Sequence, residues 1–296
     1  MVEEEVWTVG RILKWTQEYL EKSGMEAPRL DAEILLACAM KCKRIELYTH
    51  FDDVPTEEVR EQFKKMLRRR AEGMPVAYLV GKKEFYSEDF LVMEGVLIPR
   101  PETEFVLVGL FDMIKTLPEG MQGEYRLCDL GTGSGVLAII AAANLPKSRV
   151  DAVDISPEAL RVAEMNVRKH ESKIGDRVTL HEGDLFEPLR GKKYDFVLTN
   201  PPYVALTEIG ETLEENVFRY EPKIALFGGK DGTEVIRRIF DQAEEFLKPG
   251  GLLFLELSPM IYDRVMEIVQ KNEKMECVRT IYDLENRERV LVLRQK

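Results

Sequence analysis

Apolar residues recur at helical spacing through the first part of the chain. They mark three segments, at residues 9–24, 30–38 and 56–67, with Pro28 before the second and Thr56 at the start of the third. Spacings of three and four residues put apolar side chains on one face of a helix, and proline and threonine are typical of helix starts. We therefore predict a small helical bundle over residues 1–73, which contains no Gly-rich loop or strand pattern of its own.

Between residues 74 and 98 the pattern changes to short aromatic and β-branched pieces. Residues 84–86 and 90–93 are two such pieces, separated by the polar Ser87-Glu88-Asp89. This arrangement is typical of a hairpin. We interpret residues 74–98 as a β-hairpin connector that leads to a larger domain over residues 99–296.

From residue 99 onward, strand and helix patterns alternate. We predict strands at 126–130, 149–154, 178–182, 195–199 and 252–257, and helices at 102–116, 135–144, 157–170, 233–247 and 262–271. Such alternation is typical of α/β proteins with a doubly wound, mainly parallel sheet. Two last strands, 278–282 and 289–293, are joined by too few residues for a helical crossover, so they should pair antiparallel at or near one edge.

Composition narrows the classes of function. The 296 residues carry a formal net charge of -11, and 45% of them are hydrophobic. Broad, sequence-independent binding of nucleic acid needs a clustered excess of lysine and arginine. The basic run Lys64–Arg70 is a local cluster of this kind, but on a helix such a run is more often a solvated face. We expect no direct binding of nucleic acid.

Membrane and metal signatures are missing from the sequence. No apolar run approaches the ~18–20 residues of a membrane span, and the acidic start MVEEE differs from a secretory signal. The 4 cysteines show no paired spacing, and the 3 histidines stand apart from any zinc pattern. We expect reduced thiols, no metal site, no membrane association and a cytoplasmic location.

The first strand of the predicted sheet ends in a glycine-rich turn, Asp129-Leu130-Gly131-Thr132-Gly133-Ser134-Gly135. Glycine lets the backbone turn tightly and approach a ligand, because no Cβ is in the way. Val136 stands where the third glycine of a dinucleotide-binding turn would fall, so a pyrophosphate is not the expected ligand. The turn fits S-adenosylmethionine better, since that molecule brings a carboxylate and a sulfonium to this position.

Acidic residues follow the next two strands. Asp154 ends the second strand and can accept both ribose hydroxyls of a bound nucleoside. After the third strand, Asp184 can accept from the adenine amino group, and the ring of Phe186 can stack on the adenine face. With the glycine turn, these strand ends favour an adenosyl cofactor. The candidate cofactor-binding residues are Asp129, Gly131, Thr132, Gly133, Ser134, Gly135, Asp154, Ile155, Asp184, Leu185 and Phe186.

The fourth strand ends in Asn200-Pro201-Pro202-Tyr203, beside the glycine turn, where open α/β sheets bind ligands. An amide nitrogen is a poor nucleophile because its lone pair is delocalised. The Asn200 side-chain oxygen and the Pro201 carbonyl can hold its two N–H groups, and Tyr203 can stack on the planar group. We interpret the motif as the catalytic site for methyl transfer to an amide-type nitrogen, with Asn200 also next to the cofactor. Positioning and electrostatic stabilisation would supply most of the rate.

Over nearly its whole length the sequence resembles the release-factor glutamine methyltransferases, also called HemK-type enzymes. The motifs that carry the resemblance are 98–104 (IPRPETE), 129–135 (DLGTGSG), 200–203 (NPPY), 220–222 (YEP) and 225–232 (ALFGGKDG). The NPPY motif alone is shared with DNA adenine and cytosine amino-methyltransferases. Its combination with IPRPETE and an N-terminal helical bundle is much more specific.

The resemblance implies a Rossmann-like class I methyltransferase sheet, S-adenosylmethionine as cofactor, and methylation of the glutamine side chain (N5) in the Gly-Gly-Gln loop of peptide chain release factors. It also implies that Arg100 and Pro101 lie near the cofactor and that Asn200 to Tyr203 hold the glutamine. Two departures stand out. Phe186 takes the place of a tryptophan found in many members, and Glu256-Leu257-Ser258-Pro259 replaces the usual Glu-Ile-Gly.

Two other functions fit parts of the pattern. A DNA or RNA amino-methyltransferase would use the same NPPY chemistry, but it needs a target-recognition region and a base-flipping surface. A non-catalytic adenosylmethionine-binding module would have no need of an intact NPPY motif. The acidic charge disfavours the first alternative, and the intact motif disfavours the second.

Overall fold

The computed structural model describes residues 6–206 and 215–296. The chain divides into two compact units, Met1–Lys82 and Lys83–Lys296. The first unit therefore runs past residue 73, the boundary predicted for the bundle. The assignment of residues 74–98 to a separate connector stays a prediction.

The first unit is helical, as predicted. Its helices are α1 (Val9–Lys22), α2 (Pro28–Met40), α3 (Glu46–Thr49), α4 (Glu57–Ala71) and α5 (Val76–Val80). The side chains of Thr8 and Thr56 accept the N–H groups of Arg11 and Val59, which caps α1 and α4. The apolar faces of the helices meet in one buried cluster, which includes Leu20, Leu36 and Phe63. The short helices α3 and α5 carry too few periodic positions to stand out in the sequence.

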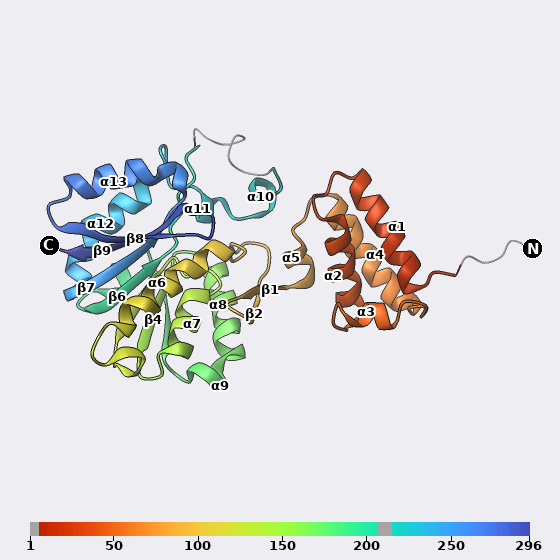
Figure 1. Ribbon diagram of the computed structural model, residues 1–296, viewed down its shortest axis with the longest axis horizontal. Helices are drawn as coiled ribbons and strands as arrows, with labels where there is room; N and C mark the ends of the chain where they lie inside the picture. Colours follow the sequence, from red (N-terminus) through yellow and green to blue (C-terminus); the bar gives the residue numbers. More distant parts are fainter. Residues whose placement is uncertain (1–5, 207–214) are drawn as a thin grey trace, which may run out of the picture. The chain divides into compact units, whose positions relative to one another are not determined.

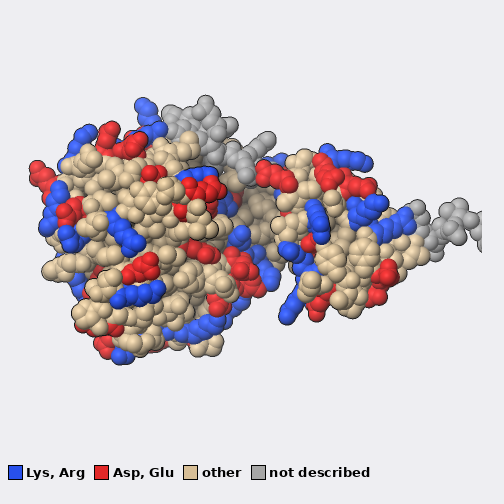
Figure 2. All heavy atoms as spheres, in the orientation of Figure 1, with Lys and Arg blue, Asp and Glu red and all other residues tan. Residues whose placement is uncertain are grey.

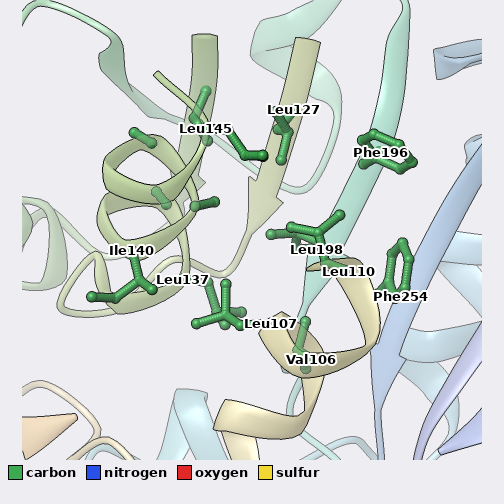
Figure 3. Packing of buried hydrophobic residues seen from close by; sticks show 14 of the residues in the cluster. Val106, Leu107, Leu110, Leu127, Leu137, Ile140, Leu145, Phe196, Leu198 and Phe254 are labelled. Atoms are coloured by element: carbon green, nitrogen blue, oxygen red, sulfur yellow. The ribbon is translucent and has the colours of Figure 1, made fainter. Parts of the chain in front are cut away.

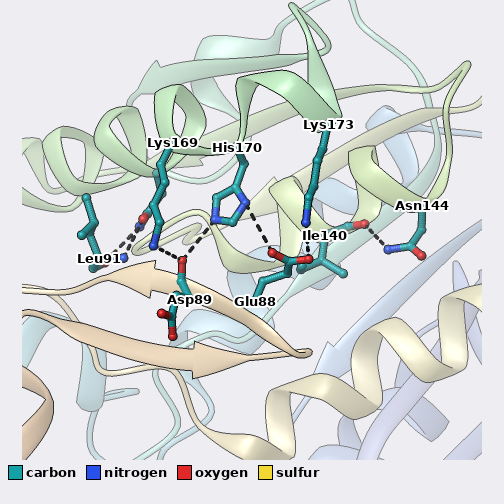
Figure 4. A network of polar contacts seen from close by, with 9 residues as sticks. Glu88, Asp89, Leu91, Ile140, Asn144, Lys169, His170 and Lys173 are labelled. Atoms are coloured by element: carbon teal, nitrogen blue, oxygen red, sulfur yellow. Dashed lines mark hydrogen bonds and ion pairs between the residues drawn. The ribbon is translucent and has the colours of Figure 1, made fainter. Parts of the chain in front are cut away.

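A hairpin precedes the main sheet of the second unit. Strands β1 (Lys82–Phe85) and β2 (Glu88–Leu91) form a two-stranded sheet. Lys169 and His170 from helix α8 (Pro157–Lys169) and its C-cap contact the Asp89 carbonyl, and Lys173 pairs with Glu88 (Figure 4). These contacts hold the hairpin against α8 and the residues that follow it.

The main sheet has seven strands in the order β5-β4-β3-β6-β7-β9-β8. Their bounds are β3 (Arg126–Leu130), β4 (Arg149–Asp154), β5 (Val178–Glu182), β6 (Tyr194–Thr199), β7 (Leu247–Glu256), β8 (Met275–Tyr282) and β9 (Glu288–Gln295). Strands β3 to β7 are parallel, whereas β9 pairs antiparallel with both β7 and β8. The predicted sheet and its antiparallel edge hairpin are thereby confirmed.

Helices cover both faces of this sheet (Figure 1). Besides α8, the unit contains α6 (Glu104–Lys115), α7 (Val136–Asn144), α9 (Glu171–Ile174), α10 (Glu215–Tyr220), α11 (Lys223–Leu226), α12 (Glu234–Phe246) and α13 (Tyr262–Lys271). Alternate strand residues point to opposite faces. Leu127 and Phe196 pack with α6 and α7 on one side (Figure 3), whereas Cys128 and Val197 pack with α12 and α13 on the other.

Because both faces are covered, most residues of the central strands β3 and β6 are buried, as in other doubly wound sheets. Ligand-binding groups are therefore left to the strand ends. Within the described residues, none of the helices combines the length and apolar character that crossing a lipid bilayer requires.

Candidate active site

The carboxyl ends of the parallel strands meet around one cavity of about 290 Å³. In the register of the sheet, Leu130 pairs with both Val153 and Thr199, so the ends of β3, β4 and β6 are adjacent. The strand order reverses at β3, which is the switch point where open α/β sheets bind ligands. The sequence-predicted residues are thereby brought to one place in the fold.

The glycine turn adopts the conformation that its sequence predicts. Gly131, Gly133 and Gly135 have φ of 68°, 57° and 86°, a region that side chains disfavour. A Cβ placed on Gly131 or Gly133 would meet no atom within 4 Å, so it would project into open space. The turn therefore leaves a cradle at the cavity wall that a larger residue would fill.

Asp129 stabilises this turn through hydrogen bonds to the turn and to the start of α7. Its Oδ2 accepts from the Thr132 hydroxyl at 2.6 Å and from the Ala138 N–H at 3.2 Å. The side chain is fully buried, and burial raises the pKa of Asp129 to about 7. Asp129 thus braces the turn and does not line the cavity.

Asp154 lies at the cavity wall and is already engaged with the backbone. Its carboxylate accepts from the Gly133 N–H at 2.8 Å and from the Ser156 N–H at 2.9 Å. Burial raises the pKa of this carboxyl, although the backbone N–H groups oppose that effect. Each carboxylate oxygen has further lone-pair capacity, which suits the predicted contact with a ribose. Ile155, next in the chain, also lines the cavity.

Of the three residues predicted after β5 to bind the cofactor, two line the cavity and one does not. Asp184 and Leu185 line the cavity, and the Asp184 carboxylate forms an ion pair with Arg238 from α12. Phe186 is fully buried and stacks on Phe246, with ring centroids 4.5 Å apart and planes 12° from parallel. The Phe186 ring therefore does not line the cavity, whereas Leu185 does, and stacking of Phe186 on adenine stays a prediction. Leu185 has a φ of 50°, which turns the following residue into the core.

Asn200 enters the cavity from the end of β6. Its side-chain Nδ2 donates to the Thr103 hydroxyl oxygen at 3.0 Å. Pro202 also lines the cavity, whereas Pro201 is buried and is not part of the lining. Burial raises the pKa of the Tyr203 hydroxyl well above its usual range, and the nearby Glu256 carboxyl adds to the effect.

The motif ALFGGKDG supports this loop. The Val204 N–H donates to the Leu226 carbonyl, and the Gly228 N–H donates to the Val204 carbonyl, at 2.9 and 3.0 Å. A Cβ on Gly228 would lie 2.4 Å from the Pro202 carbonyl oxygen, so only glycine permits this approach. The two motifs therefore form one structural unit at the cavity mouth.

Arg100 and Pro101 have different environments. Arg100 lines the cavity and pairs with the buried Glu221 carboxylate at 2.5 Å. The other oxygen of Glu221 accepts from the Ile98 N–H at 3.1 Å, so the YEP motif holds the IPRPETE segment in place. Pro101 is exposed and starts a short 3-10 turn outside the cavity.

The predicted residues thus fall into two groups. Those that line the cavity are Arg100, Gly131, Thr132, Gly133, Ser134, Asp154, Ile155, Asp184, Leu185, Asn200 and Pro202. Those that do not are Pro101, Asp129, Gly135, Phe186, Pro201 and Tyr203. Contacts of either group with a bound cofactor remain predictions.

Three further polar residues of the site were not singled out from the sequence. Thr103 and Glu221 lie inside quoted motifs, and each contacts a predicted site residue. Glu256 ends the apolar strand β7 on the same edge of the sheet and is 1% exposed. The sequence feature that could have identified Glu256 is a carboxylate at the end of a buried strand.

The cavity suits S-adenosylmethionine on structural grounds. The cradle at Gly131 and Gly133 admits a bulky group close to the backbone. Apolar side chains, including Val153 and Leu185, line the walls between the acidic residues Asp154 and Asp184. An apolar wall with a few polar groups is the usual lining of a small-molecule site, and an adenosyl ligand, with its apolar ring and polar ribose, fits that pattern.

Two family models and several known relatives match this chain. The family model described as the PrmC N-terminal domain matches residues 11–81, and the model described as the methyltransferase small domain matches residues 111–230. A release factor glutamine methyltransferase of Rhodopirellula baltica is 46% identical over 290 residues, covering 98% of this chain and 97% of that protein. Its counterpart in Geobacter sulfurreducens is 37% identical over 273 residues, covering 92% of each.

Among solved structures, a methyltransferase from Pyrococcus furiosus matches with a TM-score of 0.50 at 17% identity, over 79% of this chain and 98% of that chain. This likeness supports the fold alone. The fold and the site define an S-adenosylmethionine-dependent class I methyltransferase. The relatives narrow the class further, and the chain belongs to the release factor glutamine methyltransferase family.

Proposed function

We propose that this enzyme methylates the side-chain amide nitrogen (N5) of the glutamine in the Gly-Gly-Gln loop of peptide chain release factors. The observation that carries the proposal is the Asn200 side chain, whose Nδ2 is held by Thr103 at the cavity wall. Its Oδ1 is then the acceptor left for an incoming N–H group. The sequence relationship to release factor glutamine methyltransferases supports the choice of substrate.

S-adenosylmethionine supplies an electrophilic methyl group when it is bound. Asn200 Oδ1 and the Pro201 carbonyl would accept the two N–H groups of the substrate amide and hold its nitrogen in one orientation. These acceptors also favour the positive charge that develops on the nitrogen, which is the form of electrostatic stabilisation that contributes most in enzymes. The nitrogen becomes acidic only after substitution, so the site needs no strong general base.

The helical bundle of the first unit is proposed to dock the release factor. A glutamine side chain offers few atoms to recognise, and small contacts give limited discrimination. The match to the PrmC N-terminal domain spans residues 11–81, which supports a role for this region shared with the family. The enzyme is proposed to work in the cytoplasm, where release factors act in translation.

Direct binding of nucleic acid is not part of the proposal. The chain has a formal net charge of -11. On the face drawn in Figure 2, basic and acidic side chains are interspersed over each unit. A broad phosphate-binding surface would need lysine and arginine gathered together.

Mass spectrometry tests the proposal. The purified enzyme is incubated with S-adenosylmethionine and either an intact release factor, the same factor with its Gly-Gly-Gln glutamine changed to asparagine, or adenine-containing DNA. A gain of one methyl group on the unaltered factor alone is the expected result. Methylated DNA with an unmodified factor would instead favour the amino-methyltransferase of nucleic acids.

The variant Asn200→Ala tests the assignment of the site. We expect turnover to fall by a factor on the order of 10²–10³, as for the loss of one preorganised polar group, with little change in cofactor affinity. Asn144→Ala is the matched control, because Asn144 is exposed and, among the described residues, its side chain bonds only the Ile140 carbonyl of its own helix. Near-normal turnover of Asn200→Ala would make the motif structural.

A further inference from the structure

Arg238 forms part of the cavity wall at the end that β5 contributes. It comes from α12 and lines the cavity together with Val235, which lies three residues earlier on the same face of that helix. The Arg238 guanidinium donates to Oδ2 of the Asp184 carboxylate, which follows β5. The two side chains are 50% and 39% exposed, so the pair is open to solvent.

This ion pair has little to do with holding α12 in place. Water screens the charges of an exposed pair, which then adds little to the stability of a fold. Apolar packing holds the helix instead: Ile239 and Phe240 are buried, and Phe246 stacks on Phe186 with ring centroids 4.5 Å apart. Because that stack joins α12 to the residues after β5, it also brings Arg238 to Asp184. The effect of the pair is therefore to be sought in the cavity.

The order of the strand ends places the base of an adenosyl ligand at this pair. The sheet runs β5-β4-β3-β6 from its edge, and the Gly183 N–H donates to the carbonyl of Asp154 at 3.0 Å. Asp184 therefore follows directly beside the predicted ribose site. Asn200 follows β6, on the other side of the glycine turn. A ligand with its ribose at Asp154 and its methyl group at Asn200 has its base at the end of β5.

The Asp184 carboxylate keeps one oxygen for that base. Its Oδ2 is taken by Arg238, whereas Oδ1 accepts no hydrogen bond within the described residues. The 6-amino group of adenine is a donor, and a carboxylate oxygen is an acceptor. Without a partner, a half-exposed aspartate side chain is free to turn toward water. The contact with Arg238 opposes that rotation.

We propose that Arg238 is a positioning residue for adenine recognition, which holds the Asp184 carboxylate so that Oδ1 faces the 6-amino group of the bound base. The inference goes beyond the proposed function, because it concerns the cofactor and holds for any methyl acceptor. A guanidinium suits this role, since it stays charged and its planar donors have a fixed geometry. The bound base also excludes water from the pair, which strengthens the attraction between the two charges.

Calorimetry with two ligands and the full-length enzyme tests the proposal. The ligands are S-adenosylhomocysteine and its analogue with purine in place of adenine, which lacks only the 6-amino group. The wild type should bind the first about 10–100-fold more tightly, the fold-change for one hydrogen bond to a charged group. Arg238→Met removes the guanidinium and should lower this preference by about 3–10-fold, as for two coupled neighbours. Arg238→Lys keeps the charge and should retain most of the preference.

Arg237→Met is the matched control. Arg237 is the neighbouring residue of α12, is 52% exposed and pairs with Asp231, and it does not line the cavity. Its replacement should leave both dissociation constants within about twofold of wild type, because it shares no partner with the cavity residues. Circular dichroism of each variant checks that the enzyme is folded.

The variant Asp184→Ala separates an indirect role of Arg238 from a direct one. It removes the acceptor, so the two ligands should bind with nearly equal affinity. If Arg238 acts through Asp184, adding Arg238→Met to Asp184→Ala changes neither affinity further, since residues that act as a unit are not additive. A direct contact of Arg238 with the ligand predicts a further loss in the double variant.

Several results would overturn the inference. One is a folded Arg238→Met enzyme with the wild-type preference for the 6-amino group, and another is Arg238→Lys with a preference as low as that of Arg238→Met. An equal loss of affinity for both ligands in Arg238→Met, or a further loss in the double variant, would assign Arg238 a contact of its own with the ligand. All readouts are binding constants. An enzyme that methylates no release factor would therefore remove the proposed function and leave this inference intact.

Discussion

Replacing Asn166 with leucine is expected to loosen the attachment of the hairpin to the cofactor turn. Asn166 is fully buried on α8. Its Oδ1 accepts from the Leu91 N–H at 2.7 Å, and its Nδ2 donates to the Leu91 carbonyl at 3.0 Å and to the Ser134 carbonyl at 2.9 Å. One side chain therefore joins β2 to the glycine turn that forms the cavity wall.

The expected loss follows from these three bonds. An N–H group left unpaired in the interior costs about 1–3 kcal/mol, and each lost bond to a carbonyl costs about 0.5–1.5 kcal/mol. Leucine has a similar volume, so little is lost through a cavity. We expect Asn166→Leu to lower the free energy of unfolding by about 2–6 kcal/mol. Because Ser134 lines the cavity, the affinity for S-adenosylmethionine should also fall.

Chemical denaturation followed by circular dichroism measures this effect. Both tryptophans, Trp7 and Trp15, belong to the first unit, so their fluorescence does not report directly on the second. Asn144→Leu is the matched control and should change stability by less than about 0.5 kcal/mol, because Asn144 lies on the surface. Equal stability of the Asn166→Leu and Asn144→Leu enzymes would refute the reasoning.

Two further predictions concern carboxylates of the second unit. Asp154→Ala should weaken S-adenosylmethionine binding by about 1.5–3 kcal/mol, the range for hydrogen bonds to a charged group. Calorimetry measures this change, with the exposed Asp176→Ala as the control. Unchanged affinity in a folded Asp154→Ala enzyme would assign the ribose contact to another residue. Glu256 has a folded-state pKa of about 8 against an ordinary value of 4.5, so the folded form holds its proton more tightly and stability falls as pH rises between these values. Glu256→Gln should remove up to about 4 kcal/mol of that fall between pH 5 and 9, and identical stability profiles for the two proteins would contradict the assignment.

Local sequence patterns were sufficient for the strands and the cofactor turn. The bounds predicted for β3, β4 and β5 coincide with those of the structure, because each is a short stretch marked by apolar residues such as Leu127, Val150 and Leu180 between turn-forming residues. The turn Asp129–Gly135 could also be predicted from the sequence, since glycine readily adopts the positive φ that this turn requires. The position of Asn200 followed from the rule that parallel strands end at one edge.

Tertiary structure alone decided which way side chains face and which distant residues meet. At the end of β5, a positive φ at Leu185 sends Phe186 into the core against Phe246, which no local pattern indicates. The contact of Asn200 with Thr103 spans 97 residues of sequence. Such contacts depend on how strands are ordered in the sheet and how loops close over its edge, and these are set by packing of the whole domain. The sequence therefore determined the fold and the kind of chemistry, whereas the orientation of the acceptor side chain became visible only when the chain was folded.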